Sequence, residues 1–167
     1  MRIQTRLLIL TGITALLLGA CGTGESEAPV ANAAAPATSE APLALPRTPS
    51  PAGARVFFIT PADGDTVSSP LRIEFGIEGM SVVTAGDDAP ESGHHHLLVD
   101  TGLPELGLPI PADPHHIHFG DGSTSTELSL EPGEHTLQLL LGDHLHIPHD
   151  PPVTSAAISV TVGQAMQ

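Results

Sequence analysis

The chain has 167 residues, a formal net charge of −14 and no lysine. A strongly acidic surface repels nucleic acid and anionic lipid headgroups, so a nucleic-acid partner is excluded and a cation is favoured as a ligand. The unusual feature of the composition is ten histidines in a chain with only 2% aromatic residues.

Residues 1–20 have the layout of a secretory signal peptide. Arg2 and Arg6 precede an apolar run, residues 7–18, that is too short to span a membrane. The residues Leu18-Gly-Ala-Cys21 are typical of a lipobox, in which a small residue precedes a cysteine that becomes acylated. The sequence therefore predicts lipidation of Cys21, the only cysteine, and attachment to a membrane through that lipid. Ordinary cleavage without a lipid, or a short uncleaved anchor, is the alternative.

The residue after Cys21 indicates where such a lipoprotein is sorted. Gly22, rather than an aspartate, occupies this position, as in lipoproteins that are sorted to the outer membrane of a Gram-negative cell. The sequence thus predicts a cell-envelope lipoprotein that faces the periplasm or the cell surface.

Three further segments follow the signal. Residues 21–53 are rich in Ala, Pro, Glu, Ser and Thr without an apolar period, which predicts a disordered tether. Residues 54–163 are long enough to bury one core and are predicted to form one domain. Residues 164–167 are a short tail.

The predicted domain shows the pattern of short β-strands and no long helical period. In residues 71–78, apolar and polar side chains alternate, as in a half-buried antiparallel strand. Asp121-Gly122 and Pro132-Gly133 predict turns between strands. About seven strands in this length predict an all-β, immunoglobulin-like sandwich, with a small barrel as the competing architecture. The other predicted strands are residues 56–60, 94–100, 117–119, 124–130, 135–141 and 157–162, and residues 103–111 are predicted to form a loop.

Three histidine clusters lie within residues 94–96, 115–118 and 144–149, and each contains a His-x-His motif. Residues i and i+2 of a strand point to the same face about 6.5–7 Å apart, so two imidazoles can converge on one ion. Imidazole suits Zn(II) and Cu(II), and the sequence therefore predicts a copper or zinc site without an organic cofactor. The predicted ligands are His94, His96, His116, His118, His146 and His149, and the residues predicted to orient them are His95, Asp100, Asp113 and Asp150.

Other interpretations of the histidines remain open. Histidines in turns also fix loops by hydrogen bonds, which is the interpretation for His135 beside the turn at Pro132-Gly133. The alternative function is accordingly a metal-free, immunoglobulin-like adhesion or assembly module of the envelope. Clustered imidazoles that become charged below about pH 6.5 could sense pH, and a metalloenzyme would need an open coordination position. No catalytic residue is predicted, because no Gly-x-Ser-x-Gly or His-Glu-x-x-His motif occurs, and Asp63-Gly64-Asp65 is interpreted as a turn rather than a calcium loop.

The same strings carry a resemblance to a known family. Gly93-His-His-His-Leu-Leu98, His116-Ile-His-Phe-Gly120 and His146-Ile-Pro-His-Asp-Pro-Pro152, together with Phe58-Ile-Thr-Pro-Ala-Asp-Gly64 and Gly133-Glu-His-Thr-Leu-Gln138, resemble the DUF4399 family of uncharacterised bacterial envelope proteins. The resemblance covers residues 56–162 and implies a secreted or lipid-anchored β-rich domain without a known activity. It also implies that His115 and His144 are not fixed members of the pattern. One departure is Asp121-Gly-Ser-Thr124, where the family pattern has a glycine–glutamine–threonine run.

Overall fold

The structure is a computed structural model, and it describes residues 44–164. The predicted signal peptide, Cys21 and most of the predicted tether lie outside the described residues. The described part of the chain contains nine β-strands and no helix, and therefore no helix long and apolar enough to cross a membrane. The strands form two sheets of three and six strands, which confirms the predicted all-β sandwich.

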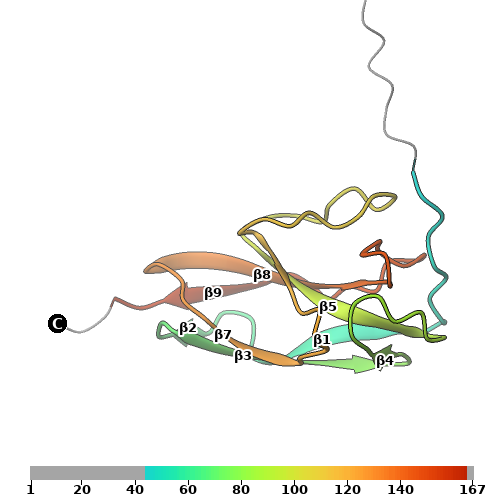
Figure 1. Cartoon of the computed structure of the whole chain (residues 1–167). Helices are drawn as coiled ribbons and strands as arrows, with labels where there is room; N and C mark the ends of the chain where they lie inside the picture. The colour runs from blue at the N-terminus through green and yellow to red at the C-terminus, as the bar shows by residue number, and fades with distance from the viewer. Residues whose placement is uncertain (1–43, 165–167) are drawn as a thin grey trace, which may run out of the picture. The chain divides into compact units, whose positions relative to one another are not determined.

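The smaller sheet has the strand order β1-β3-β7 and is antiparallel. It consists of β1 (Arg55–Thr60), β3 (Leu71–Glu78) and β7 (Ser125–Leu128). In β3 the alternation seen in the sequence decides burial, because Ile73 and Phe75 are buried whereas Arg72 is exposed. This sheet contributes one side of the core (Figure 1).

The larger sheet has the order β2-β9-β8-β5-β4, and β6 pairs with β5 on the same edge as β4. Its strands are β2 (Thr66–Val67), β4 (Ser81–Val82), β5 (Ser92–Val99), β6 (His116–His118), β8 (Gly133–Gly142) and β9 (Ile158–Val162). Two of the nine strands, β2 and β4, are only two residues long and pair in parallel, β2 with the distant β9 and β4 with β5, the next strand along the chain. Such strands are too short to show alternation, so the sequence predicted about seven.

Strand β5 is buried on both faces, and all eight of its residues are inaccessible. Leu97 and Val99 belong to the main core between the sheets, together with Leu137, Leu139 and Leu141 of β8. Leu98, which points the other way, packs with Leu140 and Ile110 in a second small cluster. Ile110 comes from the connection 100–115, which lies over the larger sheet on the side away from the smaller one (Figure 1). Residues 94 and 96 share the outer face of β5 with Leu98.

The folded domain begins before residue 54, the boundary that the sequence predicted. Residues 47–50, here called the strap, run beside residues 148–150. The amide of Asp150 donates to the carbonyl of Thr48 at 2.9 Å, and the amide of Ser50 donates to the carbonyl of Asp150 at 3.0 Å. Backbone pairing of this kind leaves no apolar period in the sequence, which explains why the strap was predicted to belong to the tether.

Candidate metal centre

Three histidines converge on the outer face of the larger sheet. His94 and His96 lie two residues apart on β5, and His118 of β6 is the cross-strand partner of His96. One ring nitrogen from each lies within 4.8 Å of those of the other two, and Nε2 of His94 lies 3.1 Å from Nε2 of His96. Two nitrogens that bind the same tetrahedral Zn(II) at about 2.0–2.1 Å lie about 3.3 Å apart. The three imidazoles are therefore close enough to hold one metal ion.

A fourth imidazole, that of His146, lies against the other three. Its ring centroid is 4.8 Å from those of His94 and His118 and 5.9 Å from that of His96. His146 comes from the turn at residues 143–147, which follows β8. These four residues, His94, His96, His118 and His146, are called the four-histidine cluster below. All four were predicted as ligands from the sequence.

Two glycines leave the space that the rings occupy. A Cβ atom on Gly120 would lie 2.4 Å from Cε1 of His118. A Cβ atom on Gly142, which pairs with His94 across the sheet, would lie 3.0 Å from Nε2 of His96. Neither position tolerates a side chain without movement of an imidazole. Gly142 was not singled out from the sequence, because nothing in its neighbourhood shows that a ring lies over it.

A buried carboxylate, Asp143, fixes the turn that carries His146. Asp143 is 2% exposed, and its Oδ1 accepts hydrogen bonds from the amides of Leu145 and Ile147, both at 2.9 Å. The amide of His146 donates to the carbonyl of Asp143 at 2.9 Å, and the carbonyl of His146 accepts from the amide of Ile110 at 2.8 Å. Sequence reasoning missed Asp143, although an aspartate that bonds the amide two residues ahead is a common turn signal.

Burial keeps His94, His96 and His118 neutral at physiological pH. Burial, followed by the neighbouring His146 and His118, lowers the pKa of His94 to about 4, and burial with His94 and His118 lowers that of His96 to about 2. The pKa of His118 is also lowered, by burial and by His146. Neutral imidazoles offer lone pairs to a metal without competition from protons. The carboxylates of Asp143 and Asp121 offset part of this lowering, because their negative charges favour the charged forms of His94 and His118, respectively.

A family model described as a domain of unknown function, DUF4399, matches residues 73–163. The chain belongs to the DUF4399 family. The match confirms the resemblance found in the sequence and includes the four-histidine cluster and Asp143, whereas the strap and β1 precede it. No curated protein and no solved structure matches the chain significantly.

Two predicted ligands of this DUF4399 domain lie apart from the cluster. His116 is on the same strand as His118, but its Nδ1 donates to Asp113 at 2.8 Å. His149 is fully buried, with its Nε2 3.2 Å from the carbonyl of Ser92. A Cβ on Gly93 would lie 3.0 Å from the His149 ring, so this ring packs on the face of β5 opposite to His94. The His-x-His spacing shows that two side chains share a face, but it does not show which other residue binds the ring.

Of the residues predicted to orient the ligands, Asp113 binds one predicted ligand, His116, which lies outside the four-histidine cluster, and the others contact other partners in the described part of the chain. Asp113 accepts from His116, and Asp150 forms an ion pair with Arg47 at 3.2 Å. His95 points into the core, where its ring contacts Phe75 at a centroid distance of 4.7 Å and burial lowers its pKa to about 4. His95 alternates with His94 and His96 along β5, so it cannot face the cluster.

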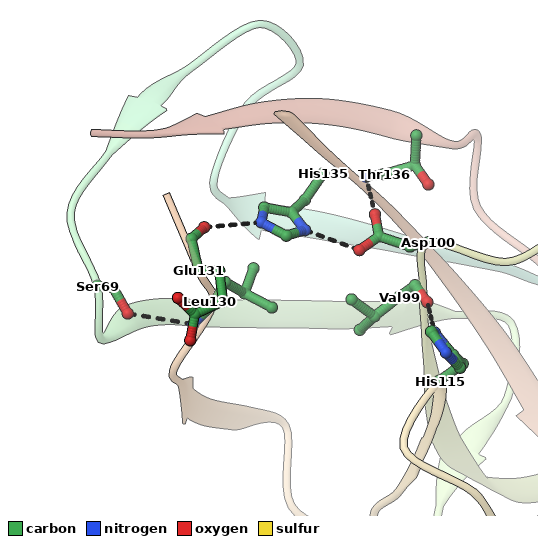
Figure 2. A network of polar contacts seen from close by, with 8 residues as sticks. All are labelled: Ser69, Val99, Asp100, His115, Leu130, Glu131, His135 and Thr136. Atoms are coloured by element: carbon green, nitrogen blue, oxygen red, sulfur yellow. Dashed lines mark hydrogen bonds and ion pairs between the residues drawn. The ribbon is translucent and has the colours of Figure 1, made fainter. Parts of the chain in front are cut away.

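Asp100, the last of these residues, is directed at His135 (Figure 2). The two ring nitrogens of His135 donate to the Asp100 carboxylate at 2.7 Å and to the carbonyl of Glu131 at 2.8 Å. Because both nitrogens face acceptors, the charged imidazolium is favoured, and the hydrogen bond to Asp100 raises the pKa of His135. Asp100 also accepts from the amide of Thr136 at 2.8 Å. His135 therefore fixes a loop, as its position beside a turn predicts.

Proposed function

We propose that this DUF4399 protein binds a divalent transition metal through His94, His96 and His118, with His146 as the fourth ligand. The observation that carries the proposal is the convergence of one nitrogen from each of the first three residues within 4.8 Å. A site built only from imidazoles suits Cu(II) or Zn(II). Met80, the only methionine among the described residues, packs against the sandwich core, so the site offers no thioether that would favour Cu(I).

The exposure of the ligands supports reversible binding. His94 and His96 are 0% and 1% exposed, whereas His118 at the edge of the sheet is open to solvent. A metal held from below by the sheet and reachable beside His118 can exchange with solvent or with another carrier. Structural zinc sites, in contrast, are closed by four buried ligands. We therefore favour sequestration or delivery of the metal over a structural role.

The sequence supports a place for this activity in the cell envelope. We propose that Cys21 carries a lipid and that the domain faces the periplasm or the surface, on the outer membrane if the cell is Gram-negative. The support is the charged and apolar layout of residues 1–20 and the small residues before Cys21. An envelope location would place the cluster where metal ions enter the cell.

Metal titration of an untagged protein tests the binding proposal. The mature chain carrying Cys21→Ser, which removes the lipid but keeps the strap, is titrated with Cu(II) and with Zn(II) and analysed for metal content. We expect stoichiometric binding, and His118→Ala should weaken it by at least about 100-fold because a ligand is lost. His144→Ala is the matched control, since His144 lies in the same turn as His146 but pairs with Asp88 at 3.2 Å.

The opposite result would favour the alternative function. If the protein takes up neither metal and its melting temperature is the same in EDTA and in metal, the cluster does not bind metal, because a ligand that binds the native state must stabilise it. The histidines would then serve only packing and hydrogen bonding, as His135 does, in a metal-free adhesion or assembly module.

A further inference from the structure

The strap contacts the connection that carries His146. Thr48 donates its hydroxyl proton to Oδ2 of Asp143 at 2.7 Å. Arg47 donates from Nε to the carbonyl of Pro148 at 2.9 Å, and it also bonds the carbonyl of His149 and the Asp150 carboxylate. Figure 1 shows the strap, in cyan, running beside this connection. Residues that are about 100 positions apart in the sequence are thus joined by side-chain and backbone hydrogen bonds.

The turn at residues 143–147 is held by hydrogen bonds within the turn and by one from the strap. His146 has a backbone φ of 66°, in the left-handed region, which non-glycine residues keep only when the surroundings hold them there. Both oxygens of Asp143 are engaged: Oδ1 accepts from two amides within the turn, and Oδ2 accepts from Thr48. The hydroxyl of Thr48 is therefore the link between the strap and the carboxylate that organises the turn.

We propose that the strap positions His146 as a metal ligand, with Thr48 acting through Asp143, so that metal affinity depends on the strap being in place. This inference rests on the proposed function. Thr48 and Asp143 are positioning residues, because neither offers an atom to the three-residue group of His94, His96 and His118. When the strap is released, the turn relaxes and the site keeps three imidazoles instead of four.

The strap lies outside the segment that the family model matches. The match begins at residue 73, whereas the strap lies where the chain leading from Cys21 joins the domain. The segment that leads to the proposed lipid anchor is thus hydrogen-bonded to the turn of the fourth ligand. A protein partner that bound and displaced the strap, or tension along the chain, would therefore weaken metal binding without touching the metal.

A pair of substitutions at Thr48 tests this inference in the full mature chain with Cys21→Ser. Thr48→Val keeps the shape of the side chain and removes the donor, whereas Thr48→Ser keeps the hydroxyl and is the matched control. With Cu(II) as the probe, we expect Thr48→Val to weaken affinity about tenfold, as for loss of a supporting hydrogen bond at a metal site. The number of nitrogens coupled to Cu(II) in the electron paramagnetic resonance spectrum should fall from four to three, as it should in His146→Ala.

Amide exchange of the metal-free protein supplies a readout that does not need metal. The amides of Leu145 and Ile147, which Asp143 holds, should exchange faster in Thr48→Val than in Thr48→Ser. If the wild-type protein binds Cu(II) through four imidazoles and Thr48→Val has the same affinity, the same spectrum and only a lower melting temperature, the strap is merely structural and the inference is overturned while the proposed function stands. If the wild-type protein takes up no metal, the proposed function falls, and the ligand role of the strap falls with it.

Discussion

The atoms around each ring nitrogen distinguish the histidines of this chain. In the four-histidine cluster, rings face one another, and the buried Nδ1 atoms of His94 and His96 have no hydrogen-bond partner in the described part of the chain. His135 instead lies between a carboxylate and a carbonyl. His-x-His spacing could predict three of the proposed ligands because strand geometry fixes which side chains share a face. It could not separate His116 from His118, because the aspartate that binds His116 becomes visible only in the fold.

At this scale, Asp100→Asn should lower the pKa of His135 towards its ordinary value of 6.5. The substitution keeps an acceptor for the Thr136 amide but removes the charge that stabilises the imidazolium. A nuclear magnetic resonance titration of the His135 ring measures the change. Glu131→Gln is the comparison variant and should lower the pKa of His135 by less, since His135 bonds the backbone carbonyl at this position and the Glu131 carboxylate acts only through its charge.

The same pair makes a pH-dependent contribution to stability. The pKa of His135 is raised in the folded protein. Its contribution to stability is therefore fully present below pH 6.5 and is lost as the pH rises through this raised pKa. The pKa of Asp100 is lowered in the folded protein. Its contribution to stability is therefore fully present above pH 3.8 and is lost as the pH falls through this lowered pKa. Asp100→Asn should therefore cost most stability between about pH 4 and pH 6.5. An equal loss at pH 9 would contradict this origin.

Among the elements, the long strands were predictable and the short ones were not. Strand β3 alternates between apolar and polar residues along its eight residues, and β8 is a ten-residue strand with four leucines, so both can be recognised from the sequence. Strands β2 and β4 and the strap have two to four residues, and only their pairing with other segments defines them. The proposed fourth ligand belongs to this second group, because His146 lies in the turn at residues 143–147 rather than on a strand.

Gly120 lies two residues after the end of β6, next to the His118 ring. Gly120→Ala should displace the His118 ring, because the new Cβ would lie 2.4 Å from Cε1 of that ring. We expect Cu(II) or Zn(II) affinity to fall about tenfold or more, as measured by competition with a chelator. Gly102→Ala is the control, since nothing lies within 4 Å of its Cβ position. Unchanged affinity in Gly120→Ala would show that the observed position of His118 is not needed for binding.

Cys21 is the proposed point at which the whole molecule is attached to the membrane. If Cys21 is lipidated, the wild-type chain expressed in a Gram-negative cell should be labelled by a fatty-acid analogue and should sediment with membranes. Cys21→Ser should abolish both, because no other cysteine can take the lipid. Gly22→Ala, which leaves the cysteine in place, is the control. A Cys21→Ser chain that still sediments with membranes would show that another feature holds the protein there.

The pairing of β5 with β8 in the buried centre of the larger sheet also affects folding. Strand β5 contains three successive histidines and then two leucines, and β8 contains three successive leucines opposite them. A slip of one residue would still place histidine opposite leucine in the middle of this pairing, so these residues alone distinguish the two alignments only weakly. The discrimination comes from the side chains, which a slip turns to the opposite face, and from the residues that flank the leucines, where Gly142 opposes His94 and Gln138 opposes Leu98. Gly142, which leaves space for the His96 ring, thus also helps to fix the register of the two strands.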